Sequence, residues 1–266
     1  MPHTTRRFFL QLAAVTVPVA AVLGRRTASA ASGVSDYFPA QPRELVEEMI
    51  VVAHGNVARV KELVGGQPTL AKATFDWGFG DWETALGAAS HVGNREIAEL
   101  LLANGAHPTM FSAAMLGQID VVKTFVAASP GIQRTRGPHS ISLMRHATAG
   151  GPKAAAVVEY LKSIDGADDK VATQPLTAEE IAKLAGVYTF GVAASDKLEV
   201  TVSSGALQIG RPGRFARGLM HIGSWTFCPV GAENVRIAFA ETTGAITVTV
   251  RDPDPIVTAR KPVKVD

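Results

Sequence analysis

The sequence predicts an α+β protein of two domains, in which a stack of about four short helix pairs precedes a small antiparallel β-barrel or strongly curled sheet. Apolar residues recur at helical spacing over residues 42–165, and four glycine-containing turns interrupt that pattern. Apolar residues then alternate like strands over residues 177–262. Residues 31–41 and 166–176 carry neither pattern, so we expect them to be linkers.

The N-terminal residues have the order of a bacterial export signal. Arg6 and Arg7 precede an apolar run over residues 12–23 and the small-residue stretch from Ala28 to Ala30. This run is too short to span a bilayer, which needs about twenty residues. The paired arginines resemble the motif of twin-arginine signal peptides, and the resemblance implies export of the folded protein to the periplasm or outside the cell. We expect residues 1–30 to be cleaved; an uncleaved membrane anchor is the alternative.

Composition argues against nucleic acid as a partner. The chain has 26 basic and 24 acidic residues, and removal of the four arginines of the predicted signal leaves 22 basic residues and a net charge of −2. No basic stripe of the kind that phosphate backbones require is left. The single cysteine, Cys228, forms no intrachain disulfide and is expected to be buried in a strand.

Each glycine turn of the helical region separates two helical segments. The second segment of each pair carries branched or aromatic apolar residues at helical spacing, which predicts one buried stripe per helix. These stripes are Val57, Val60 and Leu63; Ile97, Leu100 and Leu101; Val121, Val122 and Phe125; and Val157, Val158 and Leu161.

The segment from Thr84 to Ala106 resembles an ankyrin repeat. Thr84-Ala85-Leu86-Gly87 stands where the family has T-P-L-H, and Leu101-Leu102-Ala103-Asn104-Gly105-Ala106 matches the family's L-L-x-x-G-A. The resemblance implies stacked repeats over residues 42–165 that bind a protein or peptide partner. Gly55 and Gly93 are 38 residues apart against an ankyrin period of about 33, which predicts an enlarged connection before the second repeat.

That connection, residues 74–83, is called the finger here. Aromatic residues on loops are preferred anchors of recognition surfaces, so the finger is the predicted partner-binding site. The alternative is that its two tryptophans fold back over the short stack. Its acids are also the best candidates for acid–base chemistry, on a loop that we expect to be hydrated. The predicted binding residues are Phe75, Asp76, Trp77, Phe79, Asp81, Trp82 and Glu83.

Residues 177–262 predict the β domain. Thr177 and Glu180 form a capping box that starts a short helix, and about eight strands follow. The helix, the pattern L-x-G-x-Y-x-F and the short strands resemble the lipocalin-like domain that follows serine hydrolases related to penicillin-binding proteins. The resemblance implies a barrel and an assembly role, including an oligomer, without an active site. A carrier of a small apolar ligand is the alternative. The residues that carry the likeness are Leu184, Gly186, Tyr188, Phe190, Gly205 and Leu207.

No local motif of catalysis or metal binding occurs in the chain. The patterns G-x-S-x-G, G-x-x-x-x-G-K-[ST], H-E-x-x-H and paired C-x-x-C are all absent. We therefore predict no catalysis, no cofactor and no metal; the alternative is an enzyme whose site has no known motif.

Histidines occur at two kinds of position in the repeats. His139, Arg145 and His146 are a candidate anion site on the concave surface, because a separation of seven residues places both histidines on one face of the fourth repeat's first helix. The alternative is that these residues solvate the start of the helix and form hydrogen bonds in the core. His54 and His91 stand at nearly equivalent places before their turns and are expected to be structural caps. In the β domain, Arg211, Arg214 and Arg217 are expected to form a solvated strand edge.

Overall fold

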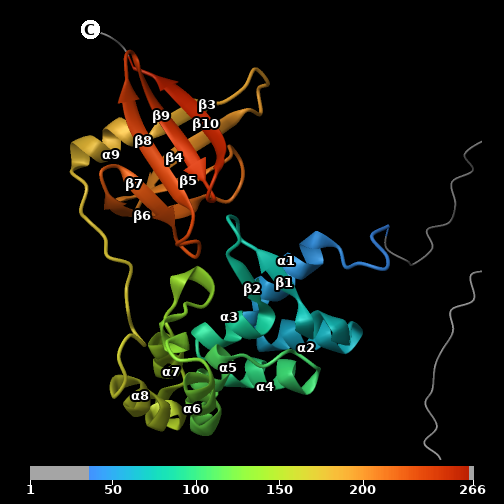
Figure 1. Ribbon diagram of the computed structural model, residues 1–266. Coiled ribbons are helices and arrows are strands. Elements are labelled where there is room, and N and C mark those ends of the chain that lie inside the picture. Colours follow the sequence, from blue (N-terminus) through green and yellow to red (C-terminus); the bar gives the residue numbers. More distant parts are fainter. Residues whose placement is uncertain (1–35, 264–266) are drawn as a thin grey trace, which may run out of the picture. The chain divides into compact units, whose positions relative to one another are not determined.

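The predicted helix pairs are present in the computed structural model, which describes residues 36–263. Arg6, Arg7, Ala28 and Ala30, which are predicted to belong to an export signal, lie outside the described residues. Residues 36–40 form a turn and belong to a different structural unit from the chain that starts at Gln41. The four pairs follow one another along the chain (Figure 1): α1 (Arg43–Ala53) with α2 (Val57–Gly66), α3 (Ala85–His91) with α4 (Arg95–Ala103), α5 (Met110–Leu116) with α6 (Ile119–Ala128), and α7 (Leu143–Ala149) with α8 (Ala155–Lys162).

Local hydrogen bonds explain where these helices begin. The side chains of Asn56 and Asn94 accept the backbone N–H groups of Arg59 and Ile97, and so cap α2 and α4. The Thr84 hydroxyl caps α3 in the same way. Short 3-10 turns complete the connections: η1 (Pro68–Lys72), η2 (Ile132–Arg134), η3 (Pro138–Ser140) and η4 (Gly151–Ala154).

Two apolar clusters hold the stack together. The first joins the first two helix pairs through Met49, Ile50, Leu86 and Ile97, and the second joins the last two pairs through residues that include Leu143. The predicted stripe was wrong for Val121 and Phe125 of α6, which are 42% and 38% exposed. These two residues are one turn apart and share an outward face, while the neighbouring Val122 faces the core.

The finger is a β-hairpin. Strands β1 (Thr74–Asp76) and β2 (Trp82–Thr84) pair antiparallel, with Phe75 opposite Glu83 and Asp76 opposite Trp82. Because side chains alternate between the two faces of a strand, Phe75 and Glu83 share the buried face, and Trp82 lies on the other. The enlarged connection predicted from the glycine spacing is therefore present before the second repeat.

The C-terminal region is a closed antiparallel barrel, as the alternating pattern predicted (Figure 1). Neighbours in the barrel are neighbours in sequence, and β10 closes it against β3. Helix α9 (Ala178–Leu184) precedes it and begins at the predicted capping box of Thr177 and Glu180. The eight strands of the barrel, all within the described residues, are β3 (Gly186–Thr189), β4 (Lys197–Ser203), β5 (Ala206–Gly210), β6 (Arg217–Gly223), β7 (Thr226–Pro229), β8 (Arg236–Thr242), β9 (Ala245–Arg251) and β10 (Pro255–Pro262).

The barrel's core consists of its own side chains. The ring of Phe239 contacts those of Tyr188 and Phe227 edge to face among the aliphatic residues of the strands. Cys228 is buried in β7, as predicted. Among residues 36–263, no helix is both long enough and apolar enough to cross a membrane.

Candidate functional site

Glu83 is a fully buried carboxylate at the base of the finger. Its side chain is 0% exposed, although it lies in a two-stranded hairpin between the exposed Trp82 and the helix cap Thr84. The indole Nε1–H of Trp77 donates to its Oε2 atom over 2.7 Å. A buried carboxylate is stable only where donors or cations surround it, so the groups around Glu83 define the site.

Two histidines from successive repeats meet at one oxygen of Glu83. His54 follows α1 and His91 ends α3, and their Nε2 atoms lie 3.1 Å apart. The Oε1 atom of Glu83 is 2.9 Å from Nε2 of His91 and 3.6 Å from Nε2 of His54. Nδ1 of His54 is 3.0 Å from the carbonyl oxygen of Ile50, which can only accept, so Nδ1 carries the proton and Nε2 of neutral His54 presents a lone pair.

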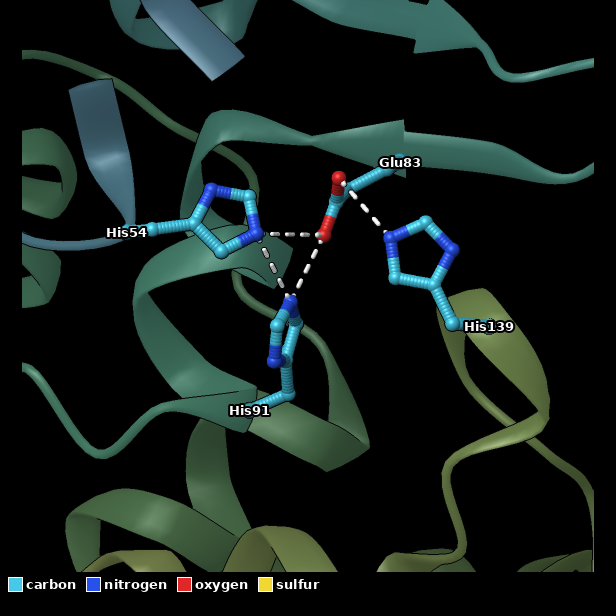
Figure 2. A group of neighbouring side chains, drawn as sticks. All are labelled: His54, Glu83, His91 and His139. Atoms are coloured by element: carbon cyan, nitrogen blue, oxygen red, sulfur yellow. Dashed lines mark hydrogen bonds and ion pairs between the residues drawn. The ribbon is translucent and has the colours of Figure 1, made fainter. Parts of the chain in front are cut away.

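A third histidine reaches Glu83 from the opposite side, as Figure 2 shows. His139 lies in η3, and its Nε2 atom is 3.2 Å from Oε2 of Glu83. Its Nδ1 atom is 2.7 Å from Oδ2 of Asp81, and its backbone N–H donates to Oδ1 of the same carboxylate over 2.9 Å. Asp81 also accepts a hydrogen bond from the guanidinium of Arg217. Asp81 therefore fixes both the position and the ring orientation of His139.

The charges of these groups depend on one another. Burial opposes protonation of His139, but hydrogen bonds to Asp81 and Glu83, and their charges, raise the pKa of its imidazole to about 9. Burial also opposes ionisation of Glu83, but hydrogen bonds from His139 and His91, with the charge of His139, lower its pKa to about 2. His139 is thus an imidazolium held between two carboxylates.

The donor atoms of this cluster are of the kinds that bind metals. His54, Glu83, His91 and His139 each offer one ligand atom, and the four atoms all lie within 4.8 Å of one another. Imidazole nitrogen and carboxylate oxygen are ordinary ligands of first-row transition metals. The cluster is called the His/Glu site below.

The structure corrects the predicted pairing of His139 with His146. The two do not lie on one face of a helix, because α7 begins only at Leu143 and His139 lies in the preceding turn with a left-handed backbone. His146 is buried in α7, and burial lowers the pKa of its imidazole to about 4. Arg145 is exposed on the same helix. The anion-binding role of these residues stays a prediction.

The expectation of hydrated acids in the finger was wrong for Asp81 and Glu83, whereas Asp76 is only half-buried. Asp81 is 2% exposed and Glu83 is 0% exposed, because both enter the charge network around His139. Arg217, predicted at a solvated strand edge, is 6% exposed and pairs with Asp81.

The other finger residues divide between the two faces of the hairpin. Phe75 is buried and Trp77 half-buried against it, whereas Trp82 is 60% exposed. Asp76 accepts the backbone N–H of Gly78, and Phe79 is half-buried. The alternative in which both tryptophans fold back therefore fits Trp77 and fails for Trp82.

Sequence reasoning missed His54 and His91 as parts of one cluster. The predicted capping role is confirmed for His54, whose Nδ1–H donates to the last turn of α1, whereas the ring of His91 turns to Glu83. The sequence feature that indicates this pair is the equivalent position of the two histidines before successive turns. Stacked repeats bring equivalent positions together, so two histidines 37 residues apart become neighbours.

Comparison with known proteins supports the helical region and identifies one repeat. Residues 81–112 match the family model of the ankyrin repeat. The matched segment contains Glu83, Thr84 and His91, so part of the His/Glu site lies within it. Searches of curated proteins and of solved structures gave no significant match. Ankyrin repeats imply a role in protein interaction.

Proposed function

We propose that the chain is an exported protein-binding module, whose ankyrin stack engages a protein or peptide partner of the cell envelope through the exposed face of the finger. The observation that carries the proposal is Trp82, which is 60% exposed on the hairpin strand that lies within the matched segment. Tryptophan is enriched among the residues that dominate binding energies at protein interfaces. Phe75 and Glu83 on the opposite face anchor the hairpin, so Trp82 is presented on a supported element.

The proposal places this interaction in the periplasm or outside the cell. Its support is the sequence of the first thirty residues, with Arg6 and Arg7 before the apolar run. Export after folding suits this protein, because its single cysteine is buried and no intrachain disulfide has to form after transport. The lipocalin-like resemblance of residues 177–262 adds an assembly role for the barrel. A ligand carrier is less well supported, because the buried apolar side chains of the described strands pack into one cluster.

Photo-crosslinking tests the binding surface. A benzoyl-phenylalanine at position 82 keeps an aromatic group there and captures a partner within reach in living cells. We expect a discrete crosslinked species from this position and none from the same residue at position 162, since Lys162 is equally exposed but lies on α8. No species at position 82, or the same species at both positions, would refute the binding surface.

Replacement of Arg6 and Arg7 by lysine tests the export route. We expect the double variant to accumulate in the cytoplasm as the uncleaved precursor, since the twin-arginine pair is the feature that the pathway reads. Cell fractionation of the wild type and the variant provides the measurement. Export of the variant at the wild-type level would contradict the proposed route while leaving the binding proposal untouched.

A further inference from the structure

We propose that His54, Glu83, His91 and His139 bind one divalent transition-metal ion, for which zinc is the best fit. Each residue comes from a different segment: the end of α1, β2, the end of α3 and η3. The ion would therefore tie together the first, second and fourth repeats of the stack.

The first argument is the spacing of the ligand atoms. Zinc lies about 2.0–2.1 Å from histidine nitrogen and carboxylate oxygen, so a tetrahedral site places neighbouring ligand atoms about 3.3 Å apart. The three contacts among Nε2 of His54, Nε2 of His91 and Oε1 of Glu83 measure 3.1, 2.9 and 3.6 Å. Three of the four ligand atoms thus already form a triangle of the required size, and that of His139 lies within 4.8 Å of them.

The second argument is the orientation of the imidazoles. Histidines that bind a metal donate their other ring N–H to a carboxylate or a backbone carbonyl, which fixes the tautomer. Nδ1 of His54 donates to the carbonyl of Ile50, and Nδ1 of His139 donates to Asp81. Both rings therefore direct Nε2 toward Glu83, as Figure 2 shows.

The third argument concerns the contact between His54 and His91. Two imidazole nitrogens at 3.1 Å attract each other only when one of them carries a proton, and Nε2 of His54 carries none in the neutral tautomer. A proton on Nε2 of His91 has two possible acceptors, His54 and Glu83, and it can form a well-aligned hydrogen bond with only one of them. A cation bound at this point attracts all three lone pairs at once. Binding of the ion releases the Nε2 proton of the His139 imidazolium to solvent, and neutral His91 binds as the tautomer that carries its proton on Nδ1.

The surroundings suit a supported site with access from solvent. Glu83 is held by the indole of Trp77, which donates to Oε2 and leaves Oε1 facing the two histidines. His54 and His139 are 33% and 25% exposed at their side chains, so an ion has a path to the site. Four protein ligands make the site complete without water, which is the arrangement of a structural zinc centre.

Metal titration of the purified full chain, without a polyhistidine tag and after treatment with a chelator, tests the proposal. We expect one equivalent of Zn²⁺ in competition with a chromogenic chelator, and the visible absorption of tetrahedral cobalt when Co²⁺ is used. Replacement of both His54 and His91 by asparagine should weaken binding at least about 100-fold, beyond the loss known for outer-sphere groups. His107→Asn, at an exposed position outside the site, is the matched control and should bind as the wild type does.

A second variant keeps the test decisive if the double variant fails to fold. His139→Asn should preserve the backbone, because His139 has a φ of 58° and asparagine tolerates this left-handed region. It should weaken Zn²⁺ binding while the far-UV circular dichroism stays unchanged. The proposal is overturned by an absence of stoichiometric binding, by several weak ions per chain that the variants do not affect, or by unchanged affinity in His139→Asn.

Discussion

Replacement of Glu83 by alanine should be among the most destabilising single changes in the repeats, even without metal. The side chain is 0% exposed and accepts from Trp77, His91 and His139. Removal of one partner from a buried ion pair costs about 3–5 kcal/mol. His139 keeps Asp81 as a partner and is 25% exposed, so its charge is not left buried and unpaired. The lower part of that range therefore applies. The expected loss is about 3 kcal/mol in the free energy of unfolding.

Urea denaturation with a chelator present measures this loss through the far-UV circular dichroism of the helices. Glu99→Ala on α4 is the control, because Glu99 is 61% exposed and pairs with Arg95 at a separation of four residues. Exposed pairs of this kind contribute about 0.3–0.5 kcal/mol. A loss below about 1 kcal/mol for Glu83→Ala, or one equal to that of Glu99→Ala, would show that the carboxylate is not the buried centre of the network.

Two further predictions concern backbone and hydroxyl contacts. Gly93→Ala should destabilise the stack by more than about 2 kcal/mol, since Gly93 has a φ of 78° and an added Cβ would overlap the carbonyl oxygen of Ala149, whereas Gly55→Ala, with open space around it, should be neutral in the same urea experiment. Tyr188→Phe should cost the barrel about 1–2 kcal/mol, because the buried hydroxyl donates to the carbonyl of Leu184 over 2.7 Å. Hydrogen exchange of the barrel amides measures this loss, and unchanged protection would contradict it.

The parts of the fold that depend on local pattern were predictable. Helix pairs follow from periodicity and caps such as Thr84, and the barrel follows from alternation along each strand. The prediction for His139 and His146 failed because a spacing of seven residues fits both a continuous helix and a turn followed by a helix. His139 fits a helical spacing with His146, but a turn with a left-handed residue intervenes, and a spacing of seven residues alone does not reveal it.

The His/Glu site was not predictable from motifs, because no two of its members come from one helix. Glu83 looks like a charged loop residue in sequence, and its burial depends on His91 from the same repeat and His139 from another. Only the repeat register held a signal, since it places His54 beside His91. A search of equivalent positions in successive repeats for ligating residues would have found that pair.

The finger carries both a ligand residue of the His/Glu site and the exposed Trp82. Side chains alternate between the two faces of a strand, so these two residues lie on opposite faces of the hairpin. Phe75 and Glu83 face inward, where Glu83 joins the His/Glu site, and Trp82 faces outward. Trp77 belongs to the inner set, because its indole nitrogen donates to Glu83. A change at Trp77 therefore disturbs the support of the hairpin, whereas a change at Trp82 alters only the exposed surface. A substitution of Trp82 therefore tests the proposed binding surface separately from the stability of the hairpin.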